Sequence, residues 1–198
     1  MLRFNMMSFR AEPRPIRFPF DERKATAAAS LLLTLAGGRM EYTRLIKLLY
    51  YVDRESLERL GRPITGDRYV AMKHGPVLSQ IYDLIKVGFA TPPAGPWADH
   101  IETTGRYDVQ VRGKPDLGPL SDLEIESIES TFKRYRNFDK WDLRDESHTL
   151  GEWEHPGESA REILIEEILQ VLGKSEAEIE EVRQAANEAA HFHSIFGR

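Results

Sequence analysis

The sequence predicts a mainly α-helical domain with a small antiparallel β-sheet (α+β), in which helices surround one buried central helix. The first observation is that residues 45–52 are apolar except for Lys47, within a predicted helix over residues 42–60. A helix that is apolar on nearly every side belongs in the interior of a domain. The second observation is that further amphipathic helical segments flank it. The third is that short alternating stretches, typical of strands, lie between these helices.

The first predicted helix covers residues 27–35, which are rich in Ala and Leu. Asp21 stands before it as a suitable N-cap, because its carboxylate can accept a hydrogen bond from a free backbone N–H. Gly37 and Gly38 end this helix. Gly61 ends the central helix, because glycine enters the left-handed conformation after a helix at little cost.

A strand is predicted over residues 68–72, followed by a tight turn from Lys73 to Pro76. Gly75 and Pro76 then predict the start of a helix over residues 76–87. Proline fits the first turn of a helix, where its missing N–H costs nothing. The predicted order in this region is therefore helix, short strand, helix.

The second half of the chain begins with a predicted β-hairpin, because residues 100–104 and 107–112 alternate on either side of a glycine turn. With residues 68–72 this hairpin would form one three-stranded sheet. Ser121 and Glu124 form a capping box at the start of a helix. The side chains that we expect this helix to bury are Leu123, Ile125 or Ile128, Phe132 and Tyr135. The remaining segments are a Gly- and Pro-rich loop (88–99), a short helix (140–147), an apolar segment (163–172) and an acidic helix (176–194).

The length of 198 residues suits one domain with appendages. We divide the chain into an extended Arg- and Pro-rich arm (residues 1–20), one domain (residues 21–173) and an acidic C-terminal helical extension (residues 174–198). The basic residues of the arm are Arg3, Arg10, Arg14 and Arg17.

The composition argues against several classes of function. Hydrophobic residues make up 41% and charged residues 30% of the chain, which suits a domain with a real core. The formal net charge of −5 disfavours general nucleic-acid binding, which depends on clustered Lys and Arg. The absence of Cys excludes disulfides, a thiolate nucleophile and Cys-ligated zinc. No stretch approaches the roughly 20 apolar residues of a membrane span. We therefore expect a cytoplasmic protein without a membrane partner.

No motif has the strength of an enzyme signature. The sequence Gly173-Lys174-Ser175 matches the last three positions of the phosphate-binding loop motif. The first glycine of that motif is missing, because Ile168 occupies its position. The densest group of potential metal ligands is His148, Glu152, Glu154 and His155, whose spacing matches no metal-site template. Residue types for acyl transfer occur only in one local segment, at Asp145, Ser147 and His148. We expect no catalytic residue, no metal and no cofactor. A small enzyme or metal-binding protein that uses His148 and nearby carboxylates remains an alternative.

Two charged features are candidates for binding a partner. A stripe at helical spacing along the central helix consists of Arg44, Lys47, Tyr51, Arg54 and Glu58. Its simpler interpretation is the solvent edge of that helix. Lys73 and His74 stand beside the predicted helix start at Gly75, where free N–H groups attract anions such as carboxylates.

Three blocks of this sequence resemble the Panacea antitoxin domain, also called the SocA-like family. The first block is Leu-Ile-Lys-Leu-Leu-Tyr-Tyr at residues 45–51, and the second is Tyr-Val-Ala-Met-Lys-His-Gly-Pro-Val at residues 69–77. The third is Ser147 and His148 followed by Trp153. The resemblance extends over about residues 21–173, with Leu-Gly-Arg-Pro-Ile (60–64) and residues 165–172 as further matches.

The resemblance implies an antitoxin that binds and neutralises a cognate toxin encoded beside it, without enzymatic activity. Some members of the family are implicated as adaptors that deliver the toxin to a protease, so a protease or its unfoldase is a further expected partner. Members associated with phages also exist. The candidate partner-binding residues are Lys47, Tyr50, Tyr51, Arg54, Lys73, His74 and Tyr82. The residues that match the family motifs, with an expected structural role, are Gly75, Pro76, Val77, His148 and Trp153.

Two further alternatives follow from the ends of the chain. The arginines of the N-terminal arm, with the charged stripe, would suit a nucleic-acid-binding regulator, although the net charge makes nucleic acid an unlikely partner. The acidic helix within residues 174–198 would suit a homo-oligomer, because its thin apolar stripe leaves it weakly anchored to its own domain.

Overall fold

The computed structural model describes residues 14–90 and 94–196. The described part of the chain is mainly helical, with two small three-stranded antiparallel sheets, which confirms the predicted fold class. The helices are α1 (Glu22–Leu35), α2 (Tyr42–Leu60), α3 (Ser79–Ala90), α4 (Pro96–His100), α5 (Asp122–Tyr135), α6 (Lys140–Ser147), α7 (Ile165–Val171) and α8 (Glu176–Phe196). The strands are β1 (Arg39–Glu41), β2 (Tyr69–Met72), β3 (Gly75–Leu78), β4 (Ile101–Thr104), β5 (Asp108–Val111) and β6 (Arg161–Ile163).

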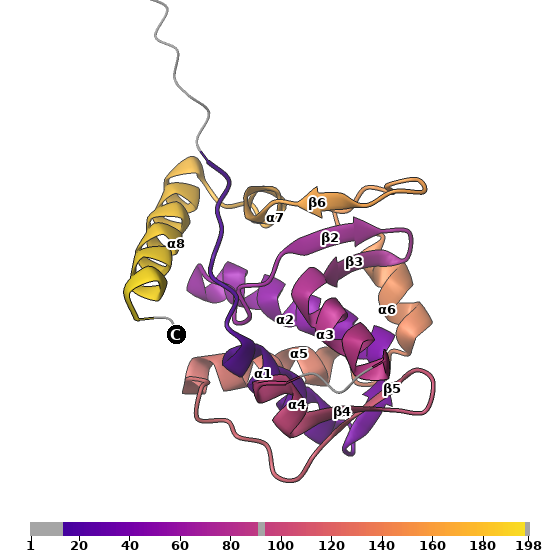
Figure 1. Ribbon diagram of the computed structural model, residues 1–198. Helices are drawn as coiled ribbons and strands as arrows, with labels where there is room; N and C mark the ends of the chain where they lie inside the picture. Colours follow the sequence, from indigo (N-terminus) through magenta and orange to yellow (C-terminus); the bar gives the residue numbers. More distant parts are fainter. Residues whose placement is uncertain (1–13, 91–93, 197–198) are drawn as a thin grey trace, which may run out of the picture.

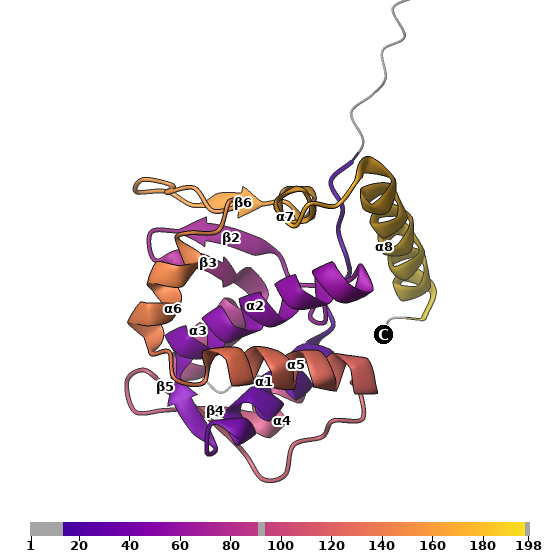
Figure 2. The ribbon, with the colours of Figure 1, turned by 180° about the vertical axis from the view of Figure 1, so that it is seen from behind.

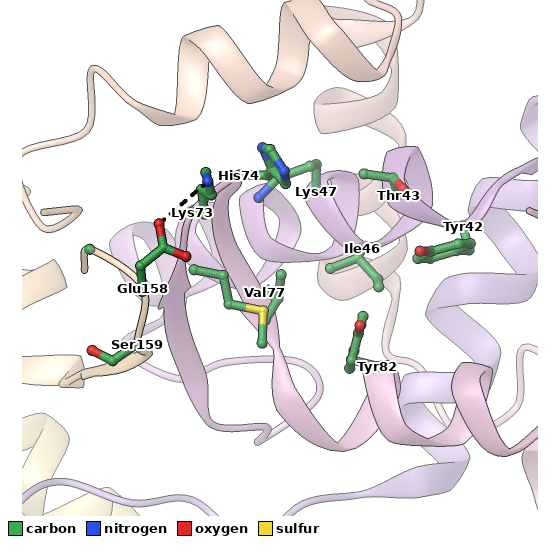
Figure 3. Close-up of a pocket in the computed structure, with 13 residues that line it drawn as sticks. Tyr42, Thr43, Ile46, Lys47, Lys73, His74, Val77, Tyr82, Glu158 and Ser159 are labelled. Carbon is green, nitrogen blue, oxygen red and sulfur yellow. Dashed lines mark ion pairs between the residues drawn. The ribbon is translucent and has the colours of Figure 1, made fainter. Parts of the chain in front are cut away.

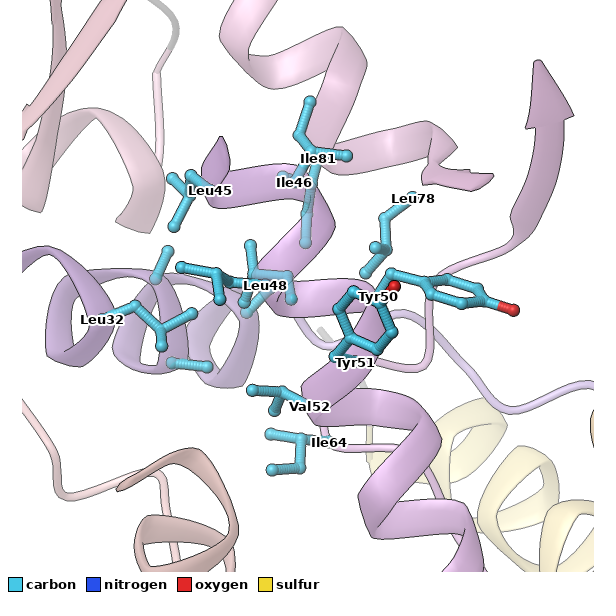
Figure 4. Close-up of a cluster of buried hydrophobic side chains, with 14 of the residues drawn as sticks. Leu32, Leu45, Ile46, Leu48, Tyr50, Tyr51, Val52, Ile64, Leu78 and Ile81 are labelled. Atoms are coloured by element: carbon cyan, nitrogen blue, oxygen red, sulfur yellow. The ribbon is translucent and has the colours of Figure 1, made fainter. Parts of the chain in front are cut away.

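Helix α2 crosses the middle of the molecule, with one sheet above it and the other sheet below it in Figure 1. Its bounds are those that the sequence predicts, and Gly61 ends it in the left-handed conformation (φ 66°). Leu45, Leu48 and Leu49 are fully buried, and Figure 4 shows the side chains of α1 and α3 that surround them. Helix α5 runs beside α2 on the other face of the molecule (Figure 2). The prediction of a buried central helix is confirmed.

The predicted hairpin forms from β4 and β5, but its sheet partner is not the one we expected. Strand β5 pairs with β1, in the order β1-β5-β4, so that buried Met40 lies opposite buried Val109. The prediction of one sheet that joins this hairpin to residues 68–72 is wrong. Strand β1 is only three residues long, and no alternation can be recognised over so short a stretch.

The second sheet has the order β3-β2-β6 and contains the second correction. The chain continues from the Lys73–His74 turn as strand β3, antiparallel to β2, and helix α3 begins only at Ser79. Pro76 is tolerated because β3 is an edge strand, where a missing N–H costs no ladder hydrogen bond. The predicted helix start at Gly75 and Pro76 is therefore wrong. The order is helix, hairpin, helix.

The N-terminus of α3 is capped by a residue that lies far before it in sequence. The carboxylate of Asp67 accepts hydrogen bonds from the backbone N–H groups of Gln80 and Ile81, at 3.0 and 2.9 Å. These free N–H groups are thus satisfied inside the protein. The candidate anion-binding helix end beside Lys73 and His74 is therefore wrong, because the chain forms strand β3 there and α3 begins only at Ser79.

Smaller differences concern the segments that follow α3. Helix α4 begins at Pro96, within the stretch predicted as a loop, and Pro92 and Pro93 of that stretch lie outside the described residues. In α5 the capping box of Ser121 and Glu124 is confirmed, but Leu123 is 54% exposed. The predicted apolar segment 163–172 contains the last residue of β6 and all of α7.

The start of the described chain and the first half of α8 meet beside α7. Ile16 is buried, and its N–H donates to Glu166 at 2.8 Å. Arg183 of α8 forms an ion pair with the same carboxylate, at 3.1 Å. Helix α8 stands at one side of the molecule (Figure 1), and only Val182 and Ala186 of it are buried. Arg3 and Arg10 of the predicted arm lie outside the described residues.

Among the described residues, no helix is both long and apolar enough to cross a membrane.

Candidate functional site

The three blocks that resemble the Panacea family come together at one place, where the β2–β3 hairpin lies against α2 and α6. Gly75 of the second block approaches Lys47 of the first and Ser147 of the third. A Cβ at Gly75 would overlap Ser147 Oγ and would come within 2.7 Å of Lys47 Nζ. The backbone of Gly75 has φ 90°, which side chains rarely adopt. Glycine is therefore required at this position for two independent reasons.

Lys47 is buried beneath the hairpin, with 1% of its surface exposed. Its ammonium group donates a hydrogen bond to the Pro76 carbonyl at 2.6 Å, and within the described chain no carboxylate lies at ion-pair distance. Burial lowers the pKa of Lys47 to about 7, because the charged form loses its hydration. A buried lysine without a carboxylate partner is uncommon in protein interiors.

His148 and Trp153 stack on each other, and Trp153 contacts the hairpin at the end of β2. Their rings stack with centroids 3.9 Å apart and planes 6° apart, and Trp153 Nε1 donates to the Met72 carbonyl at 3.2 Å. Burial lowers the pKa of His148, and nearby Lys47 adds to this effect. The structure thus places both residues against the end of β2, where their contacts fix the turn of the hairpin.

Glu152 lies between these residues in sequence and ties the same segment to α2. Tyr50 and Arg54 both donate to its Oε1, at 2.9 and 2.8 Å. Glu152 is 2% exposed and Tyr50 is fully buried. The ion pair between Arg54 and Glu152 is therefore largely interior, although the Arg54 side chain keeps 20% of its surface exposed. Tyr51, 5% exposed, stacks on Tyr135 of α5 with ring centroids 4.5 Å apart.

Most of the charged stripe on α2 is therefore not a solvent edge. Lys47 and Tyr51 are buried. Half-buried Arg44 and Arg54 bind the Phe138 carbonyl and Glu152, and only Glu58 of the stripe is exposed. The prediction of a solvated face along this helix is wrong, because α6 and the segment that follows it cover the helix there. A helical pattern of charges does not reveal which other segments of the chain will pack on it.

Among the described residues, those named for the enzyme or metal alternative form no metal-binding group. Ser147 Oγ donates to the Arg144 carbonyl at 2.7 Å. The part of the chain that the structure describes holds no group of three or more His, Cys, Asp or Glu placed to share a metal ion. His148 Nε2 is buried and has no hydrogen-bond partner among the described residues.

The candidate site is a half-open cleft of about 430 Å³ next to this cluster (Figure 3). It lies between the start of α2, the β2–β3 hairpin, α3 and the loop after Trp153. The side chains that give its walls their apolar character are Tyr42, Ile46, Met72, Val77 and Tyr82. Lys73 and His74 stand exposed at one end, and Lys47 forms part of the wall beneath them.

Aromatic and cationic side chains continue from the other end of the cleft. Lys86 Nζ donates to the Tyr42 hydroxyl at 3.0 Å and lies over the Tyr42 and Tyr82 rings, at 4.5 and 5.1 Å from their centroids. Tyr107, 46% exposed, lies next to Tyr42 with ring centroids 6.4 Å apart. Interfaces between proteins are enriched in aromatic side chains such as these tyrosines and have a polar rim, where a lysine can remain in contact with water.

The predicted partner-binding residues divide into two groups in the structure. Lys73, His74 and Tyr82 reach the cleft from accessible positions. Lys47, Tyr50, Tyr51 and Arg54 lie behind the hairpin, buried or half-buried. Sequence reasoning missed the contribution of Tyr42, Ile46 and Lys86. The spacing of Tyr42 and Ile46 at i and i+4 was the available signal, because it puts both on one face of α2.

Together, these features define a small helical domain with a well-packed interior and a half-open apolar cleft, whose edge carries aromatic and cationic side chains. The family model of the antitoxin SocA-like Panacea domain matches residues 45–154, more than half of the chain. The chain belongs to this family. No curated protein and no solved structure matches the sequence or the fold significantly.

Proposed function

We propose that this chain is an antitoxin that binds a cognate toxin protein and neutralises it by covering part of the toxin's surface. Membership of the antitoxin SocA-like family is the observation that carries this proposal. The cleft supports it, because a mostly apolar depression lined by tyrosines and surrounded by polar residues is a suitable docking surface for another protein. The proposed compartment is the cytoplasm, where a chain without cysteine needs no disulfide.

In this proposal the toxin contacts the accessible residues of the cleft, among them Lys73, His74 and Tyr82. The buried residues Lys47, Tyr50, Tyr51 and Arg54 support the docking surface from behind, because their hydrogen bonds and packing hold the hairpin and α6 in place. A rigid surface loses less conformational entropy on binding, which favours affinity.

The test is co-expression with the product of the neighbouring gene. The wild-type chain should restore growth and co-purify with that product. A variant carrying His74→Ala and Tyr82→Ala should lose both effects while keeping its thermal unfolding transition. Leu123→Ala is the matched control, because Leu123 is an exposed apolar residue on α5 that does not line the cleft. A neighbour that is harmless alone and does not co-purify would contradict the proposal.

The same strains separate masking from delivery to a protease. After protein synthesis is stopped, a masked toxin should persist as a complex with this chain. A toxin delivered to a protease should disappear, and inactivating that protease should restore it. We propose masking as the mechanism, because it requires one docking surface, for the toxin, whereas delivery would also require a surface for the protease.

A further inference from the structure

One end of the cleft is cationic. Lys47, Lys73 and His74 gather there, as Figure 3 shows. Among the described residues that line the cleft, the one carboxylate is Glu158, which is 93% exposed and lies 3.6 Å from Lys73. An exposed ion pair of this length contributes little free energy, so Glu158 can be displaced at small cost. The cationic end thus lacks a strong anionic partner within the described chain.

Lys47 is the unusual member of this group, because it is buried. A protonated lysine has three N–H donors, and one of them is used by the Pro76 carbonyl. Its pKa of about 7 means that burial already disfavours the charge near neutral pH. A carboxylate within about 4–6 Å would favour the charged form and raise that pKa again.

The rest of the cleft is lined mainly by apolar side chains and therefore suits an apolar group of a ligand. Ile46 and Val77 face it from α2 and β3, and Tyr82 closes it from α3 (Figure 3). A ligand that satisfies both ends must therefore carry an apolar group and a carboxylate a few atoms apart. Amino-acid side chains of a protein supply this combination wherever Asp or Glu stands near Leu, Ile or Val.

We propose that the cleft receives a segment of the toxin that combines an apolar side chain with a carboxylate, and that the carboxylate faces Lys47, Lys73 and His74. This inference rests on the proposed function. Its consequence is that binding above neutral pH takes up a proton at Lys47, so the affinity falls as the pH rises. The other titratable groups that face Lys47 or line the cleft are His148 from α6, Lys73 and His74 from the hairpin, Glu158 from the loop, Tyr42 from α2 and Tyr82 from α3.

The first experiment does not need the toxin. NMR titrations with 4-methylpentanoate and with its uncharged analogue 4-methylpentanamide should both shift the methyl signals of Ile46 and Val77. At pH 7 the acid should bind at least about fivefold more tightly than the amide, and this preference should shrink at pH 9. The lysine side-chain signal of Lys47 should titrate at higher pH when the acid is bound.

Two outcomes of this titration would overturn the inference. One is equal affinity for acid and amide at pH 7. The other is a shift of the same methyl signals by a deoxythymidine oligonucleotide but not by the acid, which would identify a nucleic-acid site instead. Lys47→Met should weaken the preference for the acid and abolish the change of that preference between pH 7 and pH 9. If this variant does not fold, the pH dependence of the wild-type preference decides the question alone.

The second experiment uses the toxin and separates the two proposals. If the wild-type chain binds it, the affinity should fall by up to about tenfold per pH unit above pH 7, and Lys47→Met should remove that dependence. Binding that is independent of pH and unaffected by Lys47→Met would overturn this inference and leave the proposed function standing. Selective binding of the acid without binding of any neighbouring gene product would overturn the proposed function instead.

Discussion

At the scale of single residues, Gly75 shows how the domain depends on close backbone approach. It turns the chain into β3 with a positive φ, and it leaves room for Lys47 Nζ and Ser147 Oγ, which come from different segments of the chain. Neither neighbour can withdraw easily. Lys47 is bound to Pro76 and Ser147 Oγ to Arg144. The residue thus joins backbone geometry to the packing of α2, β3 and α6.

Gly75→Ala should lower the free energy of unfolding by about 3 kcal/mol, as the sum of backbone strain and overpacking. The matched control is Gly105→Ala. Gly105 also has a positive φ (60°), but its added Cβ would meet nothing within 4 Å. That control should lose only about 1 kcal/mol. Urea unfolding of the three proteins measures both values, and equal losses would show that the crowding at Gly75 is unimportant.

Lys47 should make the stability of the protein depend on pH. Its pKa is about 7 in the folded chain and near 10.5 when unfolded, so between these values only the unfolded state binds the proton. Relative to Lys47→Met, the wild-type protein should gain about 1.4 kcal/mol for each pH unit from pH 7 to pH 10. Below pH 7 that advantage is lost and the difference becomes constant.

The measurement is urea unfolding of both proteins at several pH values between 6 and 10. Lys73→Met is the control, because Lys73 is a lysine of the same hairpin whose side chain is 59% exposed. The difference between wild type and this control should not change over the range. A constant difference between wild type and Lys47→Met would contradict the lowered pKa of Lys47 in the folded chain.

At the scale of elements, α8 is the least integrated part of the described chain. Two of its side chains are buried, and the pair of Arg183 with Glu166 links it to α7. Its last turns expose Phe192, Ile195 and Phe196, by 62%, 55% and 74%. An apolar helix end of this kind is a candidate contact between copies of the chain.

Deleting the residues after Lys174 should therefore leave the rest folded. The expected loss is about 2 kcal/mol, from the uncovered apolar surface and the lost ion pair. If α8 joins two copies, the full chain should sediment as a dimer and the shortened chain as a monomer. If sedimentation shows the same number of chains per particle for both proteins, the role of residues 174–198 in self-association is refuted.

At the scale of the whole molecule, contacts between distant segments hold the domain together. Glu152 binds Tyr50 and Arg54 of α2, about half the chain length away. Lys24 of α1 binds buried Glu124 of α5 at 2.6 Å. β6 completes the sheet begun by β2. We propose that residues 21–173 form one folding unit, because no part of it buries its apolar surface alone.

A variant that ends at Ser147 should not unfold cooperatively, since it lacks Glu152, Trp153 and β6. A variant that ends at Lys174 should show one calorimetric transition whose calorimetric and van't Hoff enthalpies agree. Calorimetry and near-UV circular dichroism of the two variants measure this. Two separate transitions in the longer variant would show that the proposed unit consists of independent parts.

Local signals were sufficient for several elements. The caps at Asp21 and Ser121 and the end of α2 at Gly61 were all predicted, because caps depend on neighbouring residues. The burial of α2 followed from its apolar content alone. The cleft was found only in part, since Lys47, Lys73, His74 and Tyr82 of its lining were predicted as binding residues and Tyr42 and Ile46 were not.

The sequence by itself determined the central helix, most other helices, the fold class and the family. Only the tertiary structure decided that Gly75–Leu78 is a strand, because its hydrogen bonds go to β2 and its following helix is capped by Asp67. It also decided that the middle of the stripe on α2, at Lys47, Tyr51 and Arg54, is covered, in part by Glu152, which lies about 100 positions away. Caps and apolar periodicity are local interactions, whereas strand pairing and the covering of a helix face depend on distant segments that no local pattern identifies.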